Sequence, residues 1–355
     1  MQKTKIIIFS YLFIIFTVFI VFICGCSTQS DDITENSPSI ILTSDVSTSE
    51  EENTTETTET STSIETAFEI ETAFGVIEIL VFNIGKADAI LITTENHTVM
   101  IDTGENKHGL EIADYLLSRD ITEIDYLIIT HFHKDHVGGA GAIINNLTVK
   151  EVIVPNYGKE SKHYNRFAAA MNESGIEQNI LKETLKFTLD NTEFTVYPPQ
   201  QEYYYYSDGS TAEDDDEYDE DENEENEDED DDENINIINE NNFSLVVNIT
   251  HGNNNFLFTG DAKAQRLKEL FFIEDIVNTR YDFLKVPHHG QSNKRSAEFI
   301  YAIMPKYAVI TCSLKNPADN NIVAALEDVG ADIYFTPNGN VYCKSNGYSL
   351  IMAYE

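Results

Sequence analysis

The stretch that decides the fold reads Thr-His-Phe-His-Lys-Asp-His-Val-Gly-Gly over residues 130–139. It follows the apolar run 125–130, typical of a strand buried on both faces, and precedes a helix expected near 137–145. Its candidate metal ligands are His131, His133, Asp135 and His136. The first two alternate along the chain and place their imidazoles on one side, whereas the last two turn toward a neighbouring point. The stretch therefore predicts two metal ions bound side by side.

Two shorter clusters follow strands that are expected later in the chain. Thr259-Gly260-Asp261 ends one of these strands, and His288-His289-Gly290 follows another. Asp261 has the chemistry of a ligand that bridges two ions, and the paired histidines offer a further imidazole. Metal sites are readily built from the ends of several strands in a packed α/β sheet. We therefore expect these clusters to join the first one.

Strand and helix patterns alternate in two similar halves. The expected strands are 76–84, 87–93, 98–101, 125–130, 151–154, 243–250, 255–259, 282–286, 307–312 and segments near Ile333 and Tyr348. The expected helices are 108–119, 137–145, 163–174, 264–271, 296–303 and 322–329. This order predicts a layered α/β sandwich rather than an all-β protein or a helix bundle.

The charge of the chain is strongly negative, at −40 over 355 residues. Residues 213–233 contribute 18 acids and no base, so the remainder carries −22. This composition argues against a basic nucleic-acid-binding face. A polyanionic substrate would have to be attracted by the bound metal ions. The acidic insertion, about 207–234, is predicted to be a disordered loop within a finished fold.

The N-terminus predicts export and tethering. Residues 1–26 combine Lys3 and Lys5 with an apolar stretch, and Ile-Cys-Gly-Cys over 23–26 resembles the bacterial lipobox. That resemblance implies lipidation of Cys26 and anchoring at the extracytoplasmic face of the cell membrane. A plain transmembrane anchor is the alternative, since 18 apolar residues are marginally long enough to span a bilayer. Residues 27–73, rich in Ser, Thr and Glu, predict a disordered linker.

The domain over 74–355 resembles the metallo-β-lactamase superfamily, through the His-x-His-x-Asp-His pattern of residues 131–136. Within it, the chain is similar to the hydrolase domain of ComEC-type competence proteins and to the phosphorylcholine-esterase-like branch. The stretch VFNIGKADAIL over 81–91, with a buried aspartate at Asp88, carries that similarity, and MIDTG over 100–104 continues it. The resemblance implies a four-layer αββα sandwich with two divalent metal ions, usually zinc, with manganese as the alternative.

Carried over by position, the resemblance implies a role for each candidate residue. The implied metal ligands are His131, His133, Asp135, His136, Asp261 and His289. Asp261 would bridge the ions, and His289 is preferred over His288, which would contact a leaving group or a substrate phosphate. Asp102 would support the loop from behind the ligands. One departure is that Glu-Asn-Asn-Phe-Ser over 240–244 stands where the family has its middle histidine ligand, so Asn242 and Ser244 become candidates for supporting or substrate-binding roles.

The function expected from these residues is metal-dependent hydrolysis of a phosphodiester through a metal-bound hydroxide, with Asp135 and Asp261 orienting the attack. The substrate would be a nucleic acid or a phosphocholine-like envelope group, and no protein partner is implied. A hydrolase of small esters, lactones or amides is one alternative, and a non-catalytic surface binding module is another. Cys312 and Cys343 are predicted either to form a disulfide or to remain two buried thiols.

Overall fold

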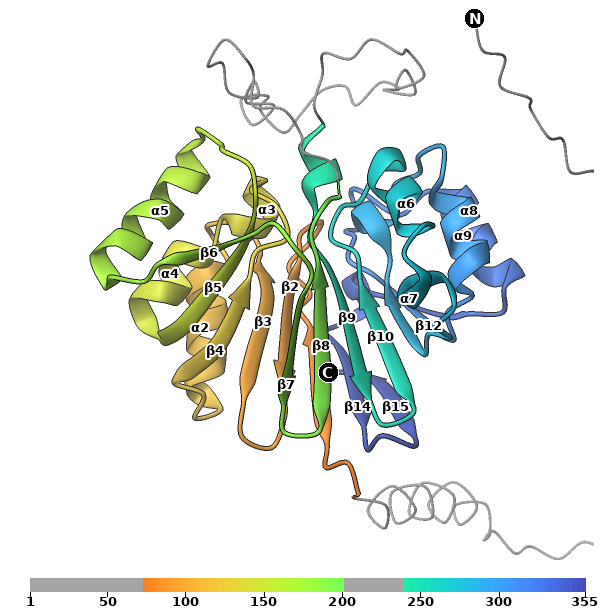
Figure 1. The fold of residues 1–355 in the computed structure, drawn as a ribbon, viewed down its shortest axis with the longest axis horizontal. Helices are drawn as coiled ribbons and strands as arrows, with labels where there is room; N and C mark the ends of the chain where they lie inside the picture. The colour runs from red at the N-terminus through yellow and green to blue at the C-terminus, as the bar shows by residue number, and fades with distance from the viewer. Residues whose placement is uncertain (1–72, 201–238) are drawn as a thin grey trace, which may run out of the picture. The chain divides into compact units, whose positions relative to one another are not determined.

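A computed structural model describes residues 73–200 and 239–355 (Figure 1). The predicted signal peptide, Cys26, the linker up to residue 72 and the acidic insertion lie outside the described residues. Within the two described ranges, no helix is both long and apolar enough to cross a membrane.

The first sheet has eight strands, and its middle strands come early in the chain. In spatial order they are β15 (Leu350–Tyr354), β14 (Val341–Ser345), β1 (Ile77–Val81), β2 (Ala89–Thr93), β3 (Thr98–Thr103), β4 (Glu123–Ile128), β5 (Thr148–Pro155) and β6 (Gln178–Leu181). Pairing is parallel from β3 to β6 and antiparallel elsewhere. The carboxyl ends of β3, β4 and β5 therefore share one edge.

The second sheet has seven strands with the same mixed character. Their spatial order is β13 (Asp332–Phe335), β12 (Tyr307–Ile310), β11 (Phe283–Lys285), β10 (Asn254–Phe258), β9 (Val246–His251), β8 (Thr192–Tyr197) and β7 (Leu185–Leu189). The strands from β10 to β13 run parallel, so the residues that follow β10, β11 and β12 emerge at the same edge.

Helices cover the outer face of each sheet (Figure 1). Beside the first sheet are α2 (Gly109–Ser118), α3 (Lys134–Val137), α4 (Ala140–Asn146) and α5 (Lys162–Ser174), and beside the second are α6 (Ala264–Leu270), α7 (Glu274–Val277), α8 (Ser296–Ile303) and α9 (Asn320–Asp328). Three apolar clusters hold the layers together: helices on the first sheet, sheet on sheet, and helices on the second sheet.

The alternation along β1 explains why these layers form. Ile79 and Val81 point into the cluster between the sheets, whereas Leu80 between them packs under the helices of the first half. Successive residues of a strand face opposite sides, so an apolar run with no polar break belongs to a strand covered on both faces. The predicted αββα sandwich is confirmed.

Several details differ from the sequence-based expectation. β6, β7 and β8 were not predicted, and Tyr348 lies in the turn between β14 and β15 rather than in a strand. Of the two alternatives for Cys312 and Cys343, the structure has the two buried free thiols, which belong to different apolar clusters.

Candidate metal centre

The loop after β4 carries the first group of candidate ligands. The chain leaves the sheet at Ile129, whose N–H donates to Ile153 O (2.9 Å), and enters α3 at Lys134. At Gly139, a Cβ atom would collide with the backbone oxygen of Thr103. The glycines that follow the histidines therefore allow close packing of backbone against β3, which fixes the direction in which the loop turns.

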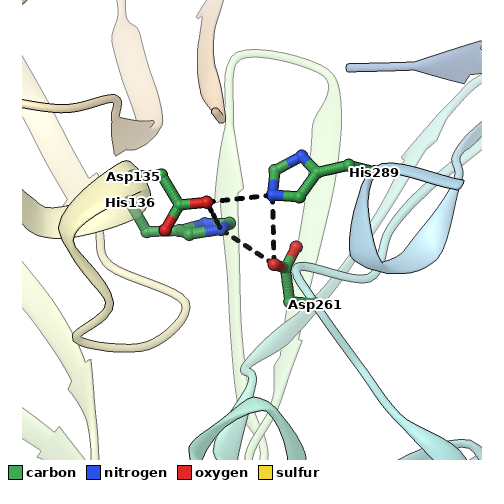
Figure 2. Close-up of side chains that lie close together, drawn as sticks. All are labelled: Asp135, His136, Asp261 and His289. Atoms are coloured by element: carbon green, nitrogen blue, oxygen red, sulfur yellow. Dashed lines mark ion pairs between the residues drawn. The ribbon is translucent and has the colours of Figure 1, made fainter. Parts of the chain in front are cut away.

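Four side chains from both halves of the sandwich meet at one point (Figure 2): Asp135, His136, Asp261 and His289. Their ligand atoms all lie within 4.8 Å of one another. Asp261 Oδ2 is 3.2 Å from His136 Nε2 and 3.1 Å from His289 Nε2. Asp135 Oδ2 is 3.2 Å from His289 Nε2 and 3.9 Å from His136 Nε2. The segments predicted to converge therefore do so.

His131 and His133 lie beside this cluster but are not members of it. The ring of His131 is centred 4.0 Å from that of His136 and 4.6 Å from that of His133. The Nε2 atom of His133 faces the buried Glu240, at 3.8 Å from Oε2. The six predicted ligands thus form a compact group of four with two imidazoles next to it.

These side chains fit the divalent metal ions that the fold family implies. The buried Nε2 atoms of His131, His136 and His289 have no hydrogen-bond partner, although two of them lie at ion-pair distance from carboxylates. Leaving a buried polar atom unpaired is costly, whereas an imidazole nitrogen with a free lone pair is a common metal ligand. Imidazole with carboxylate is also a donor set that zinc accepts.

The Nδ1 atoms of His136 and His289 lie on the opposite side of each ring from Nε2. Their polar contacts orient the two imidazoles. His136 Nδ1 donates to Asp102 Oδ2 (2.7 Å), and Asp102 Oδ1 accepts from the Thr130 N–H (2.7 Å). His289 Nδ1 lies 3.0 Å from Thr311 Oγ1, which donates to Asp88 Oδ1 (2.6 Å). Such outer contacts fix which ring nitrogen faces the metal.

Lys285 is a functional candidate that sequence reasoning missed. It is fully buried in β11, paired with Asp88, and its Nζ donates to Gly260 O (3.0 Å) and lies 3.5 Å from Asp261 Oδ1. A charged residue in the middle of the apolar run Phe-Leu-Lys-Val-Pro was the available signal. Its ammonium group offsets the negative charge that gathers around the cluster. Thr311, just after β12, was also missed, and its sequence context gives no such signal.

Burial and neighbouring charges set the protonation of the cluster. Burial opposes ionisation of Asp261, but His136, His289 and Lys285 lower the pKa of its carboxyl well below the usual range. Burial likewise opposes protonation of His136, yet Asp261, Asp102 and Asp135 raise the pKa of its imidazole well above the usual range. Without metal, the protonated imidazole of His136 therefore supplies the positive charge that these carboxylates attract.

Burial lowers the pKa of the imidazoles beside the cluster. It brings the pKa of His133 to about 4 and that of His288 to about 3. Both rings are therefore neutral near pH 7. For His133, a neutral ring is the form that can bind a metal ion.

The paired histidines after β11 have an unusual backbone. His288 and His289 have φ values of 50° and 54°, in the left-handed region that non-glycine residues rarely adopt. The His288 N–H donates to Gly260 O (3.2 Å), which connects this turn to the loop of Asp261. Non-glycine residues held in this region are often found at functional sites. The turn directs His289 into the cluster and leaves His288 beside it.

The segment in place of the family's middle histidine forms a short 3-10 helix, η2 (Glu240–Phe243). Asn242 Oδ1 accepts from the Arg266 N–H (3.0 Å), so this side chain holds the start of α6. Ser244 Oγ accepts a hydrogen bond from the Asp261 N–H (3.1 Å). Ser244 therefore supports the backbone of Asp261, the carboxylate that lies close to both His136 and His289. The prediction that Asn242 contacts substrate remains a prediction.

Comparisons with known proteins agree with this fold. Residues 83–313 match the family model described as the metallo-beta-lactamase superfamily. ComE operon protein 3 of Bacillus subtilis is 23% identical over 257 residues, which cover 67% of this chain and 29% of the relative. Recombination protein 2 of Haemophilus influenzae is 24% identical over 240 residues, covering 66% and 24% respectively. The chain thus spans under a third of either relative.

Among solved structures, the metallo-beta-lactamase fold protein YhfI of Bacillus subtilis is similar, with 10% sequence identity and a TM-score of 0.44. The match covers 79% of this chain and 100% of YhfI. The family match spans well over half of the chain and includes all six predicted ligands, and the curated matches confirm the ComEC-type resemblance. The chain therefore belongs to the metallo-beta-lactamase superfamily.

Proposed function

We propose that this protein is a metal-dependent hydrolase of phosphodiester bonds, tethered by a lipid on Cys26 at the outer face of a bacterial cell membrane. The observation that carries the catalytic part is the four-residue cluster, in which Asp261 lies within 3.2 Å of both His136 and His289. The tether rests on the lipobox-like sequence over 23–26.

The chemistry follows from how the cluster is built. Bound divalent ions would lower the pKa of a water molecule and offset the charge that develops on a phosphoryl group. Asp135 and Asp261, held as carboxylates by their cationic neighbours, would orient the attacking water. His288, beside the cluster and held in a turn with left-handed backbone, would contact the leaving group.

Local charge supports an anionic substrate despite the overall charge of −40. Lys263 and Lys86 are both close enough to His288 to lower the pKa of its imidazole, and both are partly exposed. Two cations therefore lie near His288, alongside the carboxylate of Asp261, which raises the pKa of the same imidazole. The name of the relative from Haemophilus influenzae refers to recombination, a process of DNA, and this supports a nucleic-acid phosphodiester as the proposed substrate.

The test is turnover by the purified full-length chain loaded with zinc or manganese. Substrates would be bis-p-nitrophenyl phosphate, a single-stranded oligonucleotide, p-nitrophenylphosphorylcholine and p-nitrophenyl acetate. We expect the phosphodiesters to be cleaved. The His131→Ala/His133→Ala variant should lower kcat/KM at least about 100-fold, since loss of even an outer contact of a metal ligand costs 10–100-fold.

His97→Ala is the matched control, because His97 lies in the turn between β2 and β3, at the opposite end of β2 from Asp88. Cleavage of p-nitrophenyl acetate alone would replace the phosphodiester proposal with that of a small-ester hydrolase. If the metal-loaded chain turns over none of these substrates, the result would favour the alternative of a non-catalytic surface binding module. Mass spectrometry of the mature N-terminus tests the tether, and an intact Met1 would contradict it.

A further inference from the structure

A buried carboxylate behind the metal cluster contacts residues of both sheets. Asp88, in the loop between β1 and β2 of the first sheet, is 1% exposed. One of its oxygens, Oδ2, is ion-paired with the ammonium group of Lys285 in β11. The other oxygen, Oδ1, accepts a hydrogen bond from Thr311 Oγ1 (2.6 Å), just after β12. Asp88 thus joins the first half of the sandwich to two side chains of the second half.

The contact with Thr311 determines which nitrogen of His289 faces the cluster. A threonine hydroxyl has one proton to donate, and a carboxylate can only accept. Because the Thr311 hydroxyl donates to Asp88, it accepts a hydrogen bond from His289 Nδ1, which lies 3.0 Å away. In the neutral ring, Nδ1 therefore carries the proton, and the lone pair of Nε2 is free to bind a metal ion. That Nε2 atom lies 3.1 Å from Asp261 Oδ2.

Lys285 determines which oxygen of Asp261 faces the imidazoles. Lys285 Nζ lies 3.5 Å from Asp261 Oδ1 and donates to Gly260 O (3.0 Å). The other oxygen of Asp261, Oδ2, lies 3.2 Å from His136 Nε2 and 3.1 Å from His289 Nε2. Because the ammonium group lies on the side of Oδ1, Oδ2 is the oxygen that Asp261 presents to the cluster.

These contacts form one chain that connects two candidate metal ligands from behind. In order, its members are Asp261, Lys285, Asp88, Thr311 and His289. From this geometry we propose that Asp88 is a positioning residue of the metal centre. Through Lys285 it fixes the orientation of Asp261, and through Thr311 it fixes that of His289. This inference deepens the proposed function, because it concerns the same centre, but it requires only that the cluster binds divalent ions.

The experiment measures metal binding by the full-length chain without any substrate. Metal-free protein is titrated with Co²⁺, whose visible absorption bands report the geometry of its ligands. Valine has the shape of threonine without the hydroxyl, so Thr311→Val should weaken Co²⁺ binding about 10- to 100-fold and shift the bands. Serine keeps the hydroxyl, so Thr311→Ser should bind Co²⁺ nearly as tightly as the wild-type chain and show the same bands.

A combination of variants tests whether Thr311 acts through Asp88. Asp88→Asn/Lys285→Met removes both charges of the buried pair, so that neither partner is left buried as an unpaired ion. This double variant should already bind Co²⁺ about 10- to 100-fold more weakly than the wild-type chain. The addition of Thr311→Val should then weaken binding by much less than it does in the wild-type chain, because residues of one network are not additive.

Thr336→Val is the matched control. Thr336 is also buried, and its Oγ1 lies within hydrogen-bond distance of the backbone oxygens of Ile310 (3.4 Å) and Cys312 (3.2 Å), on either side of Thr311. Thr336→Val should lower the free energy of unfolding and leave the Co²⁺ affinity and bands unchanged. Unchanged Co²⁺ binding in Thr311→Val would overturn the proposal. Equal weakening in Thr336→Val, or full additivity of Thr311→Val with the double variant, would also do so.

The outcome is separable from the proposed function. A chain that binds Co²⁺, loses affinity in Thr311→Val and cleaves no phosphodiester would retain the positioning role of Asp88 and refute the proposed activity. A chain that cleaves phosphodiesters while Thr311→Val binds Co²⁺ as tightly as the wild-type chain would do the reverse.

Discussion

At the residue scale, ligands were easier to predict than the side chains that hold them. Histidine and aspartate at fixed spacing after a strand identify metal ligands, because few other roles need those types together. Thr311 escaped notice because it looks like an ordinary polar residue near the end of a strand, whereas Lys285 was missed although its charge interrupts an apolar run. The contact between Glu240 and His133 was missed for a different reason: it joins segments that are distant in the sequence.

The contribution of Lys285 to the free energy of unfolding should be largest when no metal is bound. Lys285→Met leaves Asp88 and Asp261 buried without their shared cation, and removal of one partner of a buried ion pair typically costs about 3–5 kcal/mol. We expect the free energy of unfolding in EDTA to fall by about that amount, and added zinc to restore part of it. Denaturant unfolding of the variant, with and without metal, measures both effects.

The exposed Lys315 supplies the control for that measurement. Lys315→Met should change the free energy of unfolding by less than about 0.5 kcal/mol, as is usual for surface substitutions. A loss below about 1 kcal/mol in Lys285→Met would show that the carboxylates are already compensated by the protonated histidines.

At the element scale, the strength of the hydrophobic pattern decided what could be predicted. β1 to β5 and β9 to β12 are apolar runs or clear alternations with turn signals between them, and the structure has all of them. β6 (QNIL) and β7 (LKFTL) are short edge strands in which only the last leucine is buried, so little apolar surface indicates them. Their pairing depends on tertiary neighbours rather than on local sequence.

The turn between β7 and β8 contains a contact that ties the two sheets together. Asp190 accepts hydrogen bonds from Thr94 Oγ1 (2.7 Å), Asn96 N–H (3.0 Å) and Asn96 Nδ2 (2.9 Å), all in the turn between β2 and β3. The hydrogen bonds from Thr94 and Asn96 lower the pKa of its carboxyl. Because Asp190 is exposed, we expect Asp190→Asn to cost only about 1 kcal/mol at pH 7.

The pH dependence of that loss has a defined sign. A carboxyl whose pKa is lower in the folded state stabilises the protein above its unfolded pKa of about 3.9, and this contribution disappears as pH falls through the folded pKa. The difference between wild type and Asp190→Asn should therefore shrink between pH 5 and acid conditions in urea unfolding. Asp120→Asn, at another exposed left-handed position with φ 60°, is the control. A difference that is constant with pH would assign the effect to geometry instead of charge.

At the scale of the whole molecule, the centre depends on both halves of the sandwich. Asp135 and His136 lie in α3, which follows the first sheet's β4, whereas Asp261 and His289 follow β10 and β11 of the second sheet. The sequence predicted this meeting because the edge at which parallel strands end can be inferred from strand order. It could not supply the distances between the halves, which decide that four ligands gather while His131 and His133 lie to one side.

The net charge of −40 should control how fast a polyanionic substrate arrives. Like charges repel over the Debye length, which shrinks from about 30 Å at 0.01 M ionic strength to about 8 Å at 0.15 M. We therefore expect kcat/KM for a single-stranded oligonucleotide to rise, by up to about 10-fold, over that range. Bis-p-nitrophenyl phosphate, with one charge, should change little, and it controls for effects of salt on the metal centre.

Deleting residues 207–234 locates the source of this repulsion. The deletion removes the 18 acids of residues 213–233 together with Asp208, which changes the net charge from −40 to −21. Values of kcat/KM for the oligonucleotide at 0.01 M salt should then approach those of the intact chain at 0.15 M, with no change for the small phosphodiester. If the intact chain instead loses kcat/KM for the oligonucleotide as salt rises, attraction by Lys86, Lys263 and the bound ions outweighs the acidic run, because screening weakens whichever force dominates.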